Sequence, residues 1–319
     1  MAIPQHIKSK IPVTLKWLVF VLAIGVVYQK LQRYSWYDLY SVEFHDPQVY
    51  LPLFLLLAGL NLFLDAFIWK IIHRIVEPIQ TLRALSINLM SYALAFITPV
   101  NAGELAGRYF NLKDKAAKNK VLQLTFWSHF PRLVVKVVVL ICASFWLLPE
   151  LNKAQLWGLR FIQLLLVAGL VLIYFKWNNF QRWFQSKNIR NWQFQKYILA
   201  ERPNLTEKTK LLSLAAFKFT TYNMQFICLL LLFGNVEFSG LLLGQVFWFY
   251  ALSAFVPSVA AFDFLTKSAI GLVIFSNLPE LQPVIVQASL LMWLCNVALP
   301  ALAGNIVWLR QKKSPTATP

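Results

Sequence analysis

Two short stretches of the chain carry a proline, then an acid, then a base four residues after the acid. They are Pro99, Glu104 and Arg108 in the first stretch, and Pro257, Asp263 and Lys267 in the second. An acid and a base four residues apart share one face of a helix, so each stretch can form an ion pair that lowers the cost of charge in a low dielectric. The two pairs are either buried structural contacts or groups that are presented to a substrate.

Two further cations lie inside a hydrophobic run that begins near Val121. Arg132 and Lys136 are ~17 to 22 Å along a helix that starts there, and charge facing lipid at that depth costs at least ~2.5 kcal/mol per residue. They therefore point into the bundle, on one face. With Lys218 and Lys267 they predict a cavity for a phosphate or carboxylate group. The structural alternative is internal pairing, such as Asp65 with Lys136.

Nothing in the sequence predicts catalysis, a metal site or a cofactor. There is no G-x-S-x-G motif, Walker A loop or paired-carboxylate arrangement. The four histidines lack the spacing of metal ligands, and the three cysteines lie in apolar runs, where they pack as small hydrophobic residues. The net charge of +17 does not indicate nucleic-acid binding, because it is distributed between apolar segments instead of covering one soluble face.

The elements that position these charges are membrane-spanning helices. The chain is 58% hydrophobic and 13% charged, which is too little polarity for a water-soluble surface. Several apolar runs reach the roughly 20 residues that a helix needs to cross a bilayer. Eight hydrophobic segments, with a weaker ninth at 264–277, are expected at 13–30, 49–70, 82–99, 121–148, 155–175, 211–233, 239–257 and 283–308. The first could imitate a secretory signal, but no small-residue cleavage site follows it, so we expect it to be retained.

The sidedness of Lys and Arg sets the topology. If every segment crosses in turn from a cytoplasmic N-terminus, the stretch 176–210 with eight Lys and Arg lies outside, against the positive-inside rule. The conflict disappears if 82–113 and 239–277 are re-entrant helical hairpins with tips at Pro99, Gly103 and Pro257. Both termini are then cytoplasmic. Gly103-x-x-x-Gly107 and Gly240-x-x-x-Gly244 allow close backbone approach. The rival topology, with the N-terminus outside, leaves more basic residues on the wrong face.

The hairpin topology implies an all-α polytopic membrane protein with about six full spans, two re-entrant hairpins and an inverted repeat. Pro99 and Pro257 are 158 residues apart, and the spans starting at 49 and 211 are offset by 162. We expect one integral membrane domain over 1–313, with repeat 1 at about 13–148 and repeat 2 at about 155–310. Residues 177–208 are expected to form a cytoplasmic interfacial segment, and 314–319 a disordered tail. Inverted repeats of this kind are typical of secondary transporters.

The motifs resemble those of a known family. The run from Phe96 to Arg108 resembles the P-x-x-x-G-E-x-x-R signature of the lysylphosphatidylglycerol synthase transmembrane, flippase-like, family. Residues 130–136 and 252–270 are similar to two further motifs of that family. Pro131 and Lys136 stand where the family often has Glu and Asp, and residues 260–263 replace a glycine-rich run. We expect no soluble aminoacyltransferase domain after the membrane region.

The resemblance implies translocation of a lipid between leaflets. It implies that Arg108, Arg132 and Lys267 bind the headgroup phosphate, while Glu104 and Asp263 contact an amine or hold the hairpin tips. We therefore expect a transporter of an anionic or aminoacylated phospholipid or a lipid-linked intermediate, and not an enzyme. The expected substrate-binding residues are Glu104, Arg108, Arg132, Lys136, Asp263 and Lys267.

The expected partner is a membrane phospholipid, without nucleic acid, and homo-oligomer formation stays open. The expected location is the bacterial inner membrane. The alternatives are an accessory subunit or enzyme of envelope lipid synthesis, and an ion-coupled transporter of a small anion.

Overall fold

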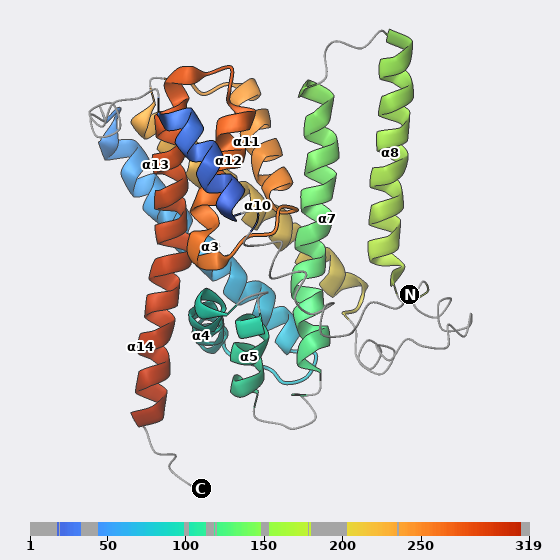
Figure 1. Cartoon of the computed structure of the whole chain (residues 1–319). Coiled ribbons are helices and arrows are strands. Elements are labelled where there is room, and N and C mark those ends of the chain that lie inside the picture. The colour runs from blue at the N-terminus through green and yellow to red at the C-terminus, as the bar shows by residue number, and fades with distance from the viewer. Residues whose placement is uncertain are drawn as a thin grey trace, which may run out of the picture.

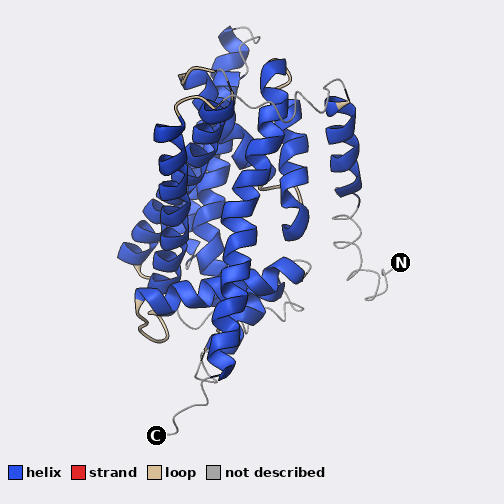
Figure 2. Ribbon diagram, turned by 90° about the vertical axis from the view of Figure 1, so that its left-hand side faces the viewer, coloured by secondary structure: helices blue, strands red, loops and turns tan. Residues whose placement is uncertain are grey.

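In the part of the chain that the computed structural model describes, helices are joined by loops and turns (Figure 2). The described residues are 18, 20–32, 44–98, 102–112, 118, 120–147, 153–177, 179, 203–234 and 236–313. Pro99, most of the expected interfacial segment and the tail at 314–319 therefore lie outside the described residues. Within the described ranges there is no strand, as expected for an all-α protein.

The first half of the chain contributes the helix Phe20–Leu31 and then four further described helices. These are α3 (Pro47–His73), α4 (Thr81–Ile97), α5 (Ala102–Asn111) and α7 (Val121–Leu147). The second half begins with α8 (Lys153–Phe175), α10 (Leu205–Phe233) and α11 (Gly240–Ser253). It ends with η3 (Ala260–Phe262), α12 (Asp263–Ile274), η4 (Pro279–Leu281), α13 (Gln282–Trp293), η5 (Leu294–Ala298) and α14 (Leu299–Lys313).

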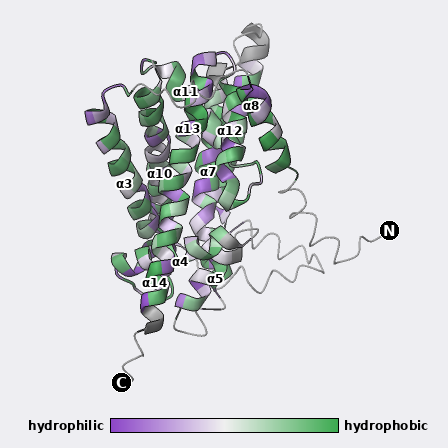
Figure 3. Cartoon of the chain, turned by 60° about the vertical axis from the view of Figure 1, so that its left-hand side comes forward, coloured by the Kyte–Doolittle hydropathy of each residue, from purple (hydrophilic) through white to green (hydrophobic). Residues whose placement is uncertain are grey.

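Among the described residues, five helical stretches are long and apolar enough to cross a membrane. They are Pro47–His73, Val121–Ser144, Trp157–Phe175, Leu205–Phe233 and Pro279–Arg310. Their outward faces are apolar, and α8 alone exposes Trp157, Phe161, Ile162, Leu164, Leu165, Leu166, Leu172 and Ile173. Exposed apolar area of this extent needs lipid around it. Hydrophobic colouring dominates these helices, whereas hydrophilic residues are visible midway along α7 (Figure 3). The chain is a multi-pass membrane protein.

The helices α4 and α5 form a tight antiparallel pair. A Cβ on Gly103 would lie 2.1 Å from the backbone of Leu94, and a Cβ on Gly107 would lie 2.6 Å from Ser91 Cα. The two glycines thus allow the backbone contact that their spacing predicted. The second glycine pattern does not act in this way, because nothing lies within 4 Å of a Cβ placed on Gly244. The close approach therefore belongs to the first pair only.

Helices from the first half of the chain pack directly against helices from the second half. The most extensive contact between described helices joins α3 of the first half to α10 of the second. In the same way, α7 of the first half packs on α11 of the second, and α14 of the second half packs on α4 of the first (Figure 1). At the latter contact, Gly304 of α14 lies against the Leu89 backbone of α4. Each half therefore completes the core of the other.

Basic residues gather at one end of the bundle, which we call the basic end. Here the Tyr174 hydroxyl donates to the carbonyl of Lys208 (2.9 Å), Lys208 Nζ donates to the carbonyl of Phe175 (3.0 Å), and the Phe126 ring lies 5.5 Å from that of Trp177. These contacts join the start of α7 and α10 to the end of α8. Basic residues at or next to helix ends of this side are Lys70, Arg74, Lys120, Lys176 and Lys210.

Acidic residues mark the opposite end of the bundle. The amide of His45 donates to the carbonyl of Leu232 (2.9 Å), and a Cβ on Gly234 would lie 2.8 Å from Leu281. The start of α3, the end of α10 and the start of α13 therefore meet here. The acids next to these helix ends are Asp46, Glu237 and Glu280.

Two local features set the helix boundaries near the site. Asn204 and Glu207 form a capping box that starts α10 at Leu205, six residues before the expected hydrophobic start at 211. The five residues Leu294–Ala298 form a π-helical turn that joins α13 to α14. Such turns widen a helix locally and are frequent at functional sites. Asn296 lies in this turn.

Candidate functional site

A cavity of about 570 Å³ lies between the two halves. Its walls come from α3, α4, α7, α10, α11, α12, the 254–259 loop and the π-helical turn. Four cations line it, Arg132, Lys136, Lys218 and Lys267, together with the carboxylates of Asp65 and Asp263. The formal charge of the lining is therefore +2 with histidine neutral. Leu133 and Ala254 also belong to the lining and are exposed, so part of the rim is apolar.

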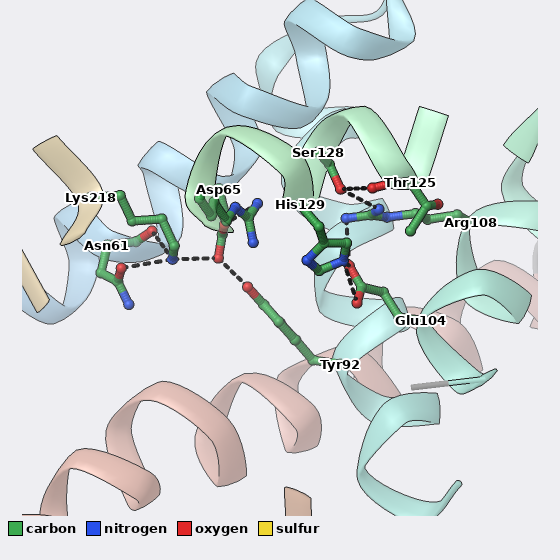
Figure 4. Close-up of polar contacts among 10 residues, drawn as sticks. Asn61, Asp65, Tyr92, Glu104, Arg108, Thr125, Ser128, His129 and Lys218 are labelled. Carbon is green, nitrogen blue, oxygen red and sulfur yellow. Dashed lines mark hydrogen bonds and ion pairs between the residues drawn. The ribbon is translucent and has the colours of Figure 1, made fainter. Parts of the chain in front are cut away.

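Asp65 is the centre of the first charge cluster in this cavity. Its Oδ2 accepts hydrogen bonds from Lys218 Nζ (2.7 Å) and from the hydroxyl of Tyr92 (Figure 4). Arg132 Nη2 lies 2.8 Å from Oδ1 as an ion pair, although its N–H does not have hydrogen-bond geometry toward that oxygen. The Asp65 side chain is only 4% exposed, and its two cationic partners meet the requirement that a buried charge be paired. Arg132 keeps donors for other partners.

A chain of amides continues this cluster into the second half. Lys218 Nζ donates to Asn61 Oδ1 (2.8 Å), and Asn61 Nδ2 donates to Asn296 Oδ1 (2.7 Å). Asn296 Nδ2 donates to Gln225 Oε1 (3.1 Å) and to the carbonyl of Met292 (2.9 Å). The π-helical turn thus presents Asn296 to both α3 and α10. Polar groups from four elements are fixed in one network.

Asp263 forms the second charge cluster, at the start of α12. Its Oδ2 pairs with Lys267 Nζ at 2.6 Å, as the i, i+4 spacing predicted, and its Oδ1 accepts from Ser258. Lys267 Nζ also donates to the hydroxyl of Tyr222 (3.0 Å) and lies 5.8 Å from the ring of Tyr250. The Asp263 and Lys267 side chains are 20% and 17% exposed, and both line the cavity.

Lys136 lies between the two clusters. Among the described residues it has no hydrogen-bond or ion-pair partner, although the charges of Lys267, Arg132, Lys218 and Asp263 act on it. The sequence-based pairing of Asp65 with Lys136 is wrong, since Asp65 contacts Arg132 and Lys218 instead. Arg132 lies one helical turn before Lys136 on α7. This difference in position along the helix places Arg132, and not Lys136, against Asp65 of α3. Lys136 is left open to the cavity.

The first-half pair, Glu104 with Arg108, lies in a separate cluster behind the cavity. Arg108 Nη2 contacts Glu104 Oε1 at 2.6 Å, and Arg108 Nη1 donates to Ser128 Oγ (2.8 Å). The guanidinium stacks 4.1 Å from the centre of the Trp69 ring. His129 Nε2 lies 3.1 Å from the Glu104 carboxylate, and His129 also lines the cavity, so it connects this cluster to it. Figure 4 shows this cluster beside the Asp65 cluster, with His129 between them.

The structure therefore separates the six expected site residues into two groups. Arg132, Lys136, Asp263 and Lys267 meet at the cavity, together with the 254–259 loop that contains Pro257. Glu104 and Arg108 do not line it. Gly103 lies at the start of α5 against α4, and Pro99 is outside the described residues. Within those residues, no group of three or more His, Cys, Asp or Glu side chains is placed to hold a metal.

Sequence reasoning missed four aromatic or imidazole side chains of the site. His129, Arg132 and Lys136 follow i, i+3 and i+7 spacing on α7, and Tyr222 follows Lys218 by four on α10, so helical periodicity contained a signal for His129 and Tyr222. Tyr92 and Tyr250 have no such signal. Their positions depend on how α4 and α11 pack.

The fold and the cavity define a class: a multi-pass helical membrane protein whose two halves enclose a cationic chamber. Its family follows from comparison with known proteins. The family model for the lysylphosphatidylglycerol synthase TM region matches residues 13–310, and the chain belongs to this family. A comparison with curated proteins gave no match.

Proposed function

We propose that the protein is a flippase-like transporter that binds the anionic headgroup of a membrane lipid in the cavity and moves it between leaflets. The observation that carries this proposal is the placement of four cations around one cavity midway along α7 and α10. Lysine and arginine donate charged hydrogen bonds to phosphate and carboxylate oxygens. A formal excess of two positive charges is unfavourable inside a membrane unless a ligand compensates it.

The packing of the two halves supports a transporter. The contacts of α3 with α10, of α7 with α11 and of α14 with α4 are those expected of an inverted repeat. In this proposal α4 with α5, and α11 with α12, are re-entrant hairpins, and six helices cross the membrane fully. An inverted repeat allows one half to rock against the other around a central site. The hydrogen-bonded amides from Asn61 to Gln225 join the two halves, so such a motion would act on them.

The proposed orientation places the basic end in the cytoplasm. Lys and Arg at this end satisfy the positive-inside rule, while the acids Asp46, Glu237 and Glu280 face outside. Both termini are then cytoplasmic and the host membrane is the bacterial inner membrane. The proposal assigns no catalytic step to any residue.

The apolar part of the cavity rim favours a lipid over a small soluble anion. Leu133 and Ala254 line the cavity and are exposed, so acyl chains can remain in the bilayer while the headgroup enters. A soluble anion has no acyl chains for such a rim to contact. The small-anion transporter is thus the second candidate.

A flipping assay tests the proposal. The protein is reconstituted into vesicles with fluorescent phosphatidylglycerol, and dithionite bleaches the outer leaflet only. We expect bleaching beyond half of the label for the parent protein and a rate at least about tenfold lower for Arg132→Gln, the loss expected for one charged hydrogen bond. Equal bleaching in protein-free vesicles would refute lipid movement.

Two further variants separate a lost site from a lost fold. Arg83 is exposed in the first turn of α4, so Arg83→Gln removes the same charge without touching the cavity. The double variant Asp65→Asn with Arg132→Gln removes both charges of the Asp65–Arg132 pair, and the asparagine amide oxygen can still accept from Lys218. Normal flipping in Arg83→Gln and slow flipping in a well-folded double variant support the site. Equal rates in all variants contradict it.

A further inference from the structure

The carboxylates of the cavity are already paired with the protein's own cations. Asp65 Oδ2 accepts from Lys218 and Tyr92 (Figure 4). Arg132 forms an ion pair with Oδ1. Both oxygens of Asp263 are likewise engaged. The nearby Glu104 pairs with Arg108 and His129 and does not line the cavity. A cationic ligand would therefore have to displace an internal cation from each carboxylate.

The amide oxygens of the lining are also occupied. Asn61 Oδ1 accepts from Lys218 at 2.8 Å, and Asn296 Oδ1 accepts from Asn61 at 2.7 Å. These bonds keep the acceptors turned toward protein groups. The cavity thus offers few acceptors to a ligand ammonium, which needs three.

Hydrogen-bond donors, in contrast, remain available at the cavity. Lys136 Nζ has no partner among the described residues. In the same part of the chain, the hydroxyl of Tyr250 and Nε of Arg132 are buried without a hydrogen-bond partner. All three side chains line the cavity, and they come from α7 and α11. Each of these groups can donate a hydrogen bond to an anionic oxygen.

We propose that the cavity selects a ligand with a phosphate-type anion and no ammonium group, and that Lys136 is the residue that excludes aminoacylated headgroups. This inference rests on the proposed function for its lipid but concerns the choice between headgroups. The ammonium of a lysyl ester would meet Lys136 and three other cations without a free carboxylate to bind. Like charges in a low dielectric repel strongly. Replacing Lys136 by an acid would supply the missing carboxylate.

Binding to the purified full-length protein tests this selectivity. Calorimetric titrations in detergent compare short-chain phosphatidylglycerol with its lysyl ester. We expect the parent to bind phosphatidylglycerol at least about tenfold more tightly, and Lys136→Met to weaken that binding on the order of tenfold. Lys136→Asp should reverse the preference. Equal affinity of the parent for both lipids overturns the inference, as does unchanged binding in Lys136→Met.

The controls keep folding and function apart from selectivity. Lys210 is exposed at the basic end, so Lys210→Met should leave both affinities unchanged, and Lys136→Arg should retain the parent preference if a cation is what matters. Loss of preference in Lys136→Arg with intact phosphatidylglycerol binding would contradict the role of charge. Glycerol 1-phosphate serves as a probe without acyl chains.

The outcomes separate this inference from the proposed function. Flipping of both lipids at equal rates would leave the transporter intact and remove the selectivity. Lys136-dependent binding of glycerol 1-phosphate without binding or flipping of any lipid would support anion selectivity and overturn the lipid transporter.

Discussion

The two i, i+4 ion pairs of the protein have the same spacing but different surroundings. Glu104 and Arg108 are 14% and 3% exposed, and Trp69, Ser128 and His129 enclose them. Asp263 and Lys267 are 20% and 17% exposed and line the cavity. The first pair therefore fixes α5 against α3 and α7, whereas the second is placed where a ligand can reach it. A shared sequence pattern does not imply a shared role.

This difference also concerns the helices that carry the pairs. The first pair lies on α5, which packs backbone to backbone on α4, while α12 shows no comparable glycine contact with α11. The first pair is thus supported by a backbone-to-backbone helix contact that the second pair lacks. Four substitutions test this difference.

The largest expected effect is that of Arg108→Met. It leaves Glu104 buried with His129 as its only counter-group among the described contacts, and loss of one partner from a buried pair costs about 3–5 kcal/mol. A titration with sodium dodecyl sulfate measures the free energy of unfolding. A cost no larger than that of Lys267→Met would end the distinction between the two pairs.

Gly107→Ala is expected to cost about 1–3 kcal/mol of stability. The new Cβ would lie 2.6 Å from Ser91 Cα, which is backbone and cannot move aside without shifting α4. The same titration measures the loss. Wild-type stability would show that α4 and α5 are not held by this contact.

Lys267→Met is expected to cost about 1 kcal/mol of stability, because the cavity is partly exposed and Ser258 still donates to Asp263. Flipping of phosphatidylglycerol should nevertheless fall, because a cation of the cavity is lost. The test is the loss of flipping relative to the loss of stability in Lys267→Met, compared with the same ratio in Arg108→Met. Full flipping activity would exclude Lys267 from the site.

The smallest expected effect is that of Gly244→Ala, a gain of a few tenths of a kcal/mol. Nothing lies within 4 Å of the added Cβ, and alanine favours a helix over glycine. It is the matched control for Gly107→Ala. A destabilisation similar to that of Gly107→Ala would mean that α11 has a close partner after all.

Much of the fold could be predicted because hydrophobicity and length determine where helices cross a membrane. The expected segments at 49–70 and 121–148 correspond to α3 and α7 within three residues. The start of α10 was missed because the capping box of Asn204 and Glu207 lies in a polar stretch that hydropathy does not detect. Local capping chemistry, present in the sequence, was the better guide there.

The site was harder to predict, since which charges meet depends on helix rotation and depth. The sequence placed Arg132 and Lys136 on one face, but a single helical turn decides which of them reaches Asp65. Tyr92 reaches Asp65 only because α4 packs beside α3. Contacts between distant segments of this kind leave no periodic pattern.

The π-helical turn at Leu294–Ala298 determines how one long helix serves both halves. Before it, α13 packs mainly on α12, and after it, α14 packs on α4. A turn that holds one additional residue rotates all later side chains by about 100° relative to an uninterrupted α-helix. Deleting a single residue within this turn would therefore turn Gly304 away from Leu89 and separate α14 from α4, while leaving every residue of that interface unchanged in identity.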